Sequence, residues 1–144
     1  MRALVFHNPT AGANGHEKED ILAALRLADI DAKYFSTKRG DLTKAFDSSA
    51  DFVVAAGGDG TVAMVLRLLP DRKLPVAILP LGTANNLARS LGIAGTPQEL
   101  VETWQLEHIC PLDIGVAHLG GGRELFLEAF GVGPSVSKRN SAIP

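Results

Sequence analysis

The sequence is poor in cysteine, in aromatic residues and in long apolar runs. Cys110 is the single cysteine among 144 residues, which excludes an intrachain disulfide and a zinc site built from several cysteines. The apolar run at 52–56 is far shorter than the roughly 20 residues that a membrane-spanning helix needs. The opening MRALVFHNP lacks the apolar core and cleavage pattern of a signal peptide. We therefore expect a cytoplasmic protein without a transmembrane segment.

The sequence also lacks an excess of charge of either sign. It contains 14 Lys and Arg against 16 Asp and Glu, a formal net charge of −2. This balance predicts no general attraction to nucleic acid or to an anionic membrane surface, so an anionic ligand would have to be held by local features of a site. With 46% hydrophobic residues, the chain is long enough to form a domain with a core.

Strand and helix signals alternate along the first 110 residues. Compact apolar runs predict strands at 3–7, 52–56 and 75–79, and a further strand is expected at 32–36. Apolar periodicity, Pro70, a Gly92 cap and the Thr96 capping box predict helices at 17–28, 41–46, 62–69, 87–91 and 97–105. This alternation is typical of an α/β fold, with a mostly parallel sheet between two layers of helices.

The pattern changes after residue 110. Alternating residues at 112–117, a glycine-rich turn at 120–123 and a second extended run at 125–132 predict an antiparallel β-hairpin. We therefore expect an α/β nucleotide-binding domain over 1–110, followed by a hairpin and tail over 111–144.

Three polar, glycine-bearing loops follow predicted strands: NPTAG at 8–12, GGDGT at 57–61 and LGTANN at 81–86. In parallel sheets, ligands bind beyond the carboxyl ends of the strands, where all three loops are expected. The coincidence of three such loops at one edge predicts a binding site.

The GGDGT loop suits a phosphate group. Gly57, Gly58 and Gly60 leave the main chain bare, and their N–H groups lie near a helix N-terminus; Thr61 adds a hydroxyl. The Asp59 carboxylate would repel a phosphate unless Mg²⁺ lies between them or the carboxylate meets a substrate hydroxyl. The alternative is a tight strand-to-helix turn in which Asp59 is the N-cap.

The flanking loops offer further polar groups. The first loop supplies the Asn8 amide, the Thr10 hydroxyl and the bare backbone of Gly12. The third loop supplies Gly82, Thr83, Asn85 and Asn86 ahead of a helix. For the first loop, the alternative is a plain connection between strand and helix. For the third loop, the alternative is an ordinary helix start capped by Thr83 or Asn85.

Together, NPTAG, GGDGT and PLGTANNLA at 80–88 resemble the diacylglycerol kinase catalytic domain, a family that includes bacterial lipid kinases and sphingosine kinases. Order and spacing both match, and the resemblance covers nearly the whole chain. GGDGT also occurs in NAD kinases and, in variant form, in phosphofructokinases, whose fold is similar. The NPxxG and GT-x-N elements favour the lipid kinases.

This resemblance implies transfer of the ATP γ-phosphoryl group to a lipid hydroxyl in phospholipid metabolism, assisted by Mg²⁺. It implies that Asp59 lies near the reacting groups as the catalytic residue. Peripheral membrane contact and oligomerisation stay open. The implied nucleotide contacts are Asn8, Thr37, Gly57, Gly58, Gly60, Thr61, Gly82, Thr83 and Asn85, to which the loop chemistry adds Thr10 and Gly12.

The chain departs from the family pattern at three positions. Met64 stands where the family often has glutamate, on a helix face expected toward the cleft, and Ala84 and Asn86 replace a glycine and an aspartate. Family members also carry a second, β-sandwich domain that supplies the proposed general base, and the predicted hairpin resembles its entry. Two other functions remain open: an NAD kinase-like phosphotransferase and a non-catalytic nucleotide-binding regulatory module.

Other reactive side chains are expected to be structural. The four histidines show no ligand spacing, and His7, beside the first loop, is the best placed of them for a chemical role. Cys110 is expected to be a small core residue, and Trp104 to pack its helix against the core.

Overall fold

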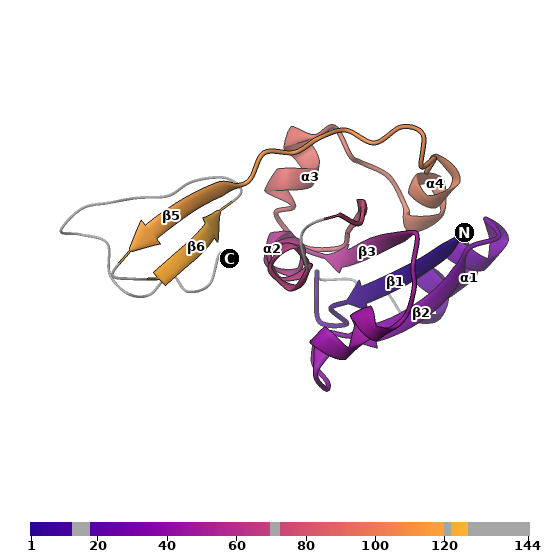
Figure 1. Cartoon of the computed structure of the whole chain (residues 1–144). Coiled ribbons are helices and arrows are strands. Elements are labelled where there is room, and N and C mark those ends of the chain that lie inside the picture. Colours follow the sequence, from indigo (N-terminus) through magenta and orange to yellow (C-terminus); the bar gives the residue numbers. More distant parts are fainter. Residues whose placement is uncertain (13–17, 70–72, 120–121, 127–144) are drawn as a thin grey trace.

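A four-stranded parallel sheet in the order β2-β1-β3-β4 forms the centre of the chain (Figure 1). The computed structural model describes residues 1–12, 18–69, 73–119 and 122–126. Its elements are β1 (Arg2–His7), α1 (Lys18–Leu27), β2 (Asp31–Ser36), η1 (Leu42–Asp47), β3 (Phe52–Gly57), α2 (Asp59–Leu68), β4 (Val76–Pro80), α3 (Asn86–Ser90), α4 (Pro97–Glu102), β5 (Gly115–Leu119) and β6 (Gly122–Phe126). All four predicted strands of the parallel sheet are confirmed.

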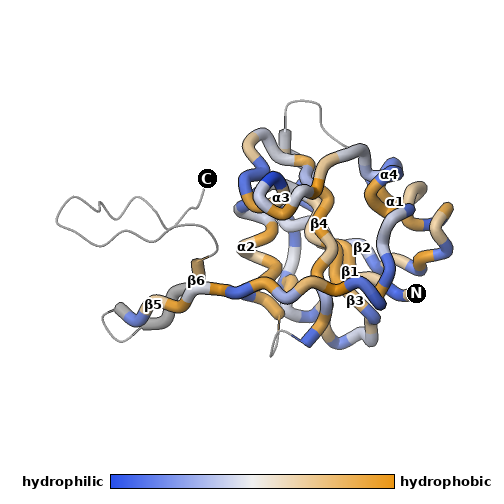
Figure 2. Tube along the Cα trace, turned by 90° about the horizontal axis from the view of Figure 1, so that it is seen from above, coloured by the Kyte–Doolittle hydropathy of each residue, from blue (hydrophilic) through white to orange (hydrophobic). Residues whose placement is uncertain are grey.

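Both faces of this sheet are covered, which confirms the three-layer α/β architecture. Side chains alternate along each strand, so Val5 faces one layer while Leu4 and Phe6 face the other. One layer contains α1 and α4, and the other contains α2, α3 and η1. Figure 2 shows apolar residues concentrated on the central strands and on the inner sides of the helices. This double burial explains why the central strands β1 and β3 are apolar along nearly their whole length.

The helices lie where the sequence predicts them, but some differ from the prediction in length or in helix type. The segment at 42–47 forms a 3₁₀ helix, and α4 ends at Glu102, three residues before the predicted end. The chain leaves α4 where the Trp104 ring packs edge-on against Phe52, with ring centroids 5.8 Å apart. That contact confirms the packing role expected for Trp104.

The end of α3 is fixed by the predicted glycine. Gly92 has φ +70°, and its N–H donates to the Arg89 carbonyl while the Ile93 N–H donates to the Ala88 carbonyl. This pair of hydrogen bonds is the Schellman arrangement, which needs the left-handed conformation that glycine adopts without strain.

Residues 115–119 and 122–126 pair as the predicted antiparallel hairpin (Figure 1). The first strand begins at Gly115 rather than at residue 112, and the expected continuation at 127–132 lies outside the described residues. Ile114, just before β5, packs against the core layer of α2 and α3.

Cys110 contradicts the sequence-based expectation. It is exposed rather than buried, as is its neighbour Ile109, because the chain at 107–113 runs over the surface, between the core contacts made by Leu106 and Ile114. Among the described residues, no helix is both long enough and apolar enough to span a bilayer.

The predicted capping box at the start of α4 is present, and it gives a first testable result. The Thr96 hydroxyl accepts from the Glu99 N–H, and the Glu99 carboxylate accepts from the Thr96 N–H at 2.8 Å. We expect Thr96→Ala to lower the free energy of unfolding by about 1 kcal/mol at neutral pH, measured by urea denaturation. A loss near zero would show that the box adds nothing.

The same capping box makes part of the stability dependent on pH. The hydrogen bond from the Thr96 N–H holds the pKa of Glu99 below its ordinary value. The contribution of the Glu99 carboxylate is therefore present above its ordinary pKa and is lost as the pH falls through the lowered folded pKa.

Candidate functional site

The three polar loops meet at the carboxyl edge of the sheet. The register aligns His7 with Ala56, and Gly57 with Pro80, so neighbouring strands end together. The Asn8 N–H donates to the Ala56 carbonyl at 2.9 Å, and the Leu81 N–H donates to the Gly57 carbonyl at 3.0 Å. Backbone hydrogen bonds therefore join both flanking loops to the GGDGT strand.

The GGDGT and GT-x-N loops touch through glycines. A Cβ atom on Gly82 would lie 2.5 Å from the Gly58 Cα, and one on Gly58 would lie 3.3 Å from the Gly82 Cα. A Cβ atom on Gly57 would meet the Thr61 side chain, which is buried. The sequence predicted that Gly57, Gly58 and Gly60 stay bare for a phosphate group. The structure adds a second reason for a missing side chain, above all at Gly82: the main chains of the two loops pass close together.

Asp59 is buried between the second and third loops. Its Oδ2 accepts from the Asn86 N–H and its Oδ1 from the Leu87 N–H, both at 3.0 Å. The N-cap of α2 is Gly58, and Asp59 is the first residue of that helix. The alternative interpretation, in which Asp59 caps its own helix, is therefore wrong: its carboxylate caps α3, from 27 and 28 residues away.

Asn85 holds the third loop in shape. It has the left-handed backbone conformation, with φ 50°, and its amide nitrogen donates to the carbonyls of Pro80 and Gly82. Its Oδ1 accepts from the Gly82 N–H at 3.0 Å. Asn85 is the N-cap of α3 by position, but its side chain gives no cap bond to α3, and Thr83 lies exposed ahead of it. The alternative interpretation, a helix start capped by the side chain of Thr83 or Asn85, is therefore wrong, since the side-chain acceptor described at the start of α3 belongs to Asp59.

The first loop forms a compact turn over the end of β1. The Asn8 Oδ1 accepts from the Thr10 N–H at 3.2 Å and from the Thr10 hydroxyl at 2.9 Å. Gly12 has φ +75°, and a Cβ atom there would collide with the Leu81 carbonyl oxygen. Gly12 thus brings the first loop against the third.

The remaining predicted site residues lie at the same edge. Thr37 directly follows β2, and its N–H donates to the His7 carbonyl at 2.8 Å. Gly60 is exposed in the first turn of α2. All eleven predicted nucleotide-contact residues and Asp59 therefore belong to the three loops or to the adjoining end of β2.

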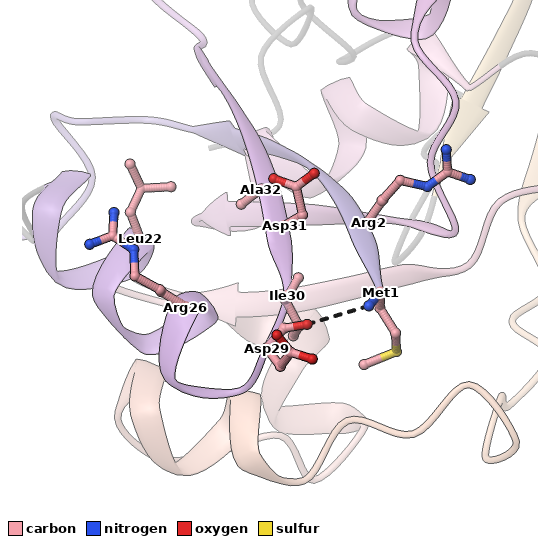
Figure 3. Close-up of a pocket in the computed structure, with 8 residues that line it drawn as sticks. All are labelled: Met1, Arg2, Leu22, Arg26, Asp29, Ile30, Asp31 and Ala32. Carbon is pink, nitrogen blue, oxygen red and sulfur yellow. Dashed lines mark hydrogen bonds between the residues drawn. The ribbon is translucent and has the colours of Figure 1, made fainter.

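A hollow of about 490 Å³ lies at the opposite edge of the sheet (Figure 3). It is lined by Met1, Arg2, Leu22, Arg26, Asp29, Ile30, Asp31 and Ala32. Because Arg2 and Asp31 begin β1 and β2, this hollow adjoins the amino ends of the strands and is separate from the three loops.

Residues 2–117 match the family model of the diacylglycerol kinase catalytic domain. The chain belongs to this family. It is 28% identical over 123 residues to a diacylglycerol kinase of Staphylococcus saprophyticus, covering 79% of this chain and 40% of that one. It is 36% identical over 101 residues to a diacylglycerol kinase of Bacillus subtilis, covering 64% of this chain and 33% of that one.

The fold is also that of a solved family member. The crystal structure of a diacylglycerol kinase from Bacillus anthracis matches with a TM-score of 0.66 and 30% identity, over 85% of this chain and 45% of that one. The family and fold inferred from the three motifs are thus confirmed. The chain spans less than half the length of these relatives.

Two features of this diacylglycerol kinase family member were not foreseen. Met64 is half-buried and packs against the core layer of α2 and α3, whereas the sequence placed it on a face toward the cleft. Ala84 and Asn86, the other two departures, are exposed.

The second feature is a His7–Tyr34 pair beneath the first loop. The His7 Nδ1 lies 2.9 Å from the Tyr34 hydroxyl, and the Lys18 ammonium lies 4.9 Å from the centre of the Tyr34 ring. Burial, followed by the negative charge of Glu19, raises the pKa of Tyr34 against the opposing effect of Arg39. The shared face of alternating residues on neighbouring strands is the sequence signal that could have paired these side chains.

Proposed function

We propose that this chain is the ATP-binding part of a lipid kinase that transfers the γ-phosphoryl group of ATP to a lipid hydroxyl. The observation that carries this proposal is the meeting of three polar loops at one edge of the sheet in a diacylglycerol kinase family member. Since the chain spans less than half of its relatives, the lipid pocket and the general base are assigned to a second domain.

The phosphate groups of ATP are proposed to bind at the start of α2. This helix has ten residues, and its N-cap, Gly58, carries no side chain that could occupy the first N–H groups. Such N–H groups and the positive end of the helix dipole attract phosphate. The proposed contacts are Gly57, Gly58, Gly60 and Thr61 from the second loop, Asn8, Thr10 and Gly12 from the first loop, Thr37 directly after β2, and Gly82, Thr83 and Asn85 from the third loop.

The described residues do not form a Mg²⁺ site by themselves. No group of three His, Cys, Asp or Glu side chains among them is placed to hold a metal ion. Asp59 is the carboxylate at the loops, and both of its oxygens already accept backbone N–H groups. Magnesium is commonly held by one or two carboxylates together with substrate phosphates. We therefore assign Mg²⁺ to the substrate, Mg·ATP, rather than to a site built by this part of the chain.

A nucleotide-binding module without catalysis has less support than a lipid kinase, because the family model that matches is that of a catalytic domain. An NAD kinase-like activity has less support, since the family match favours lipid kinases. The proposed setting is the cytoplasm, with contact at a membrane surface where the lipid is presented.

Calorimetric titration with Mg·ATP and Mg·ADP tests the nucleotide site. We expect dissociation constants in the micromolar to millimolar range, about 1 μM to 1 mM, and weaker binding of adenosine, which lacks the phosphates. Ligand at a hundredfold excess over its dissociation constant should raise the free energy of unfolding by about 2.7 kcal/mol. Absence of both heat and thermal protection at millimolar Mg·ATP would contradict the proposal.

A further inference from the structure

Helix α3 lacks a cap of its own. It has only five residues, too few to be stable alone, and its first N–H groups have no partner within the helix. The N-cap residue Asn85 uses its amide inside the third loop. Asp59 therefore supplies, from another helix, the acceptors that an N-cap side chain normally provides.

The other attachments of α3 are its buried apolar side chains and the closure of its far end. Leu87 and Ala88 are buried in the core layer shared with α2, and the far end is closed at Gly92. At the first turn, the attachments to the second loop are the Asp59 carboxylate and the contact between Gly58 and Gly82. The Leu81 N–H also donates to the Gly57 carbonyl at the base of the third loop, but the Asp59 carboxylate is the link that reaches the backbone of α3 itself.

The charge of Asp59 suits this position. The residue is the first of α2, and its oxygens receive N–H groups from the start of α3, so the carboxylate lies at the N-termini of two helices. A negative charge is favourable at each of these ends. Two charge-assisted hydrogen bonds also explain how a carboxylate is tolerated in a loop suited to phosphate.

We propose that Asp59 is a positioning residue, which holds α3 and the GT-x-N loop against the GGDGT loop and so gives the nucleotide site its shape. Its effect on nucleotide affinity rests on the proposed function; its effect on α3 does not. In this role the carboxylate acts through the backbone of Asn86 and Leu87, and the general base of the reaction is a different group.

Two variants of the 144-residue chain test this role. Asp59→Asn keeps the size and one acceptor but loses the other, whereas Asp59→Ala loses both. We expect amide hydrogen exchange at Asn86 and Leu87 to be faster in both variants, with the larger change in Asp59→Ala. The dissociation constant for Mg·ATP should rise in the same order, by about tenfold for Asp59→Ala.

Thr96→Ala is the matched control. It removes a helix cap from α4, in the opposite layer, and should lower stability while leaving Mg·ATP affinity unchanged. An equal loss of affinity in this variant would show that general destabilisation, rather than positioning, explains the Asp59 result. If Asp59→Ala does not fold, the isosteric Asp59→Asn protein decides the question.

Two results would overturn the proposal. Unchanged exchange at Asn86 and Leu87 in Asp59→Asn would show that the carboxylate does not hold α3. Complete loss of Mg·ATP affinity in Asp59→Asn, with α3 still protected, would show that the charge acts directly on the ligand. If the unaltered chain binds no nucleotide, the proposed function fails, but the exchange result still decides whether Asp59 holds α3.

Discussion

Replacing Gly82 by alanine is expected to lower the free energy of unfolding by about 2–3 kcal/mol and to abolish measurable Mg·ATP binding. The added Cβ would lie 2.5 Å from the Gly58 Cα, 2.7 Å from the Asn85 Oδ1 and 3.0 Å from the Gly58 nitrogen. Two of these atoms belong to the backbone of the GGDGT loop, so they cannot turn aside as a flexible side chain would. The third loop must therefore move away from the second, and a site shared by both loops is lost.

Gly58→Ala provides the comparison for Gly82→Ala. It adds a methyl group to the same contact from the other side, at 3.3 Å from the Gly82 Cα and 3.8 Å from the Asn85 Oδ1. A shift of a few tenths of an ångström relieves that contact, so we expect a smaller loss, about 1 kcal/mol. Urea denaturation and calorimetry measure both variants. Equal stability of Gly82→Ala and the unaltered chain would contradict the close approach of the two loops.

The sheet and its loops could be predicted because each strand and loop is specified by residues within its own segment of the sequence. The run at 52–56 is apolar throughout, and a strand buried on both faces needs that composition. Once four such strands alternate with helices, their carboxyl ends must share an edge, and the position of the three loops follows. Gly92 and the Thr96 capping box act on neighbouring residues, so sequence spacing was enough to find them.

The role of Asp59 could not be predicted because its partners are remote in sequence. Its carboxylate receives N–H groups from residues 27 and 28 positions later, and main-chain donors have no signature in the sequence. The contact between Gly58 and Gly82 could not be predicted for the same reason. A glycine indicates that space is needed, but not whether a ligand or another main chain fills that space. Cys110 was placed in the core from its apolar neighbours, yet none of the described elements covers it.

At this edge of the sheet, polar side chains hold the loops in place. Asp59 and Asn85 hydrogen-bond to backbone groups of the third loop and α3, and Asn8 to Thr10. These bonds fix the loops in one arrangement before a ligand arrives, which lowers the ordering cost of binding. In the proposed nucleotide site, N–H groups of the main chain would therefore make most of the phosphate contacts.

Gly12→Ala should show how much the first loop contributes to this arrangement. Gly12 has φ +75°, where an alanine is strained by about 1–2 kcal/mol, and its Cβ would also collide with the Leu81 carbonyl oxygen. We expect a total loss of about 3 kcal/mol in the free energy of unfolding and weaker Mg·ATP binding, because the first loop must withdraw from the third.

Gly40→Ala separates the two causes of that loss. Gly40 has nearly the same backbone angle, φ +73°, but a Cβ there meets nothing within 4 Å among the described residues. It should therefore cost only the strain, about 1–2 kcal/mol, and leave Mg·ATP affinity unchanged. The difference between the two variants measures the contact with Leu81. Equal losses of stability would mean that backbone strain alone accounts for Gly12, and that the first and third loops do not depend on each other.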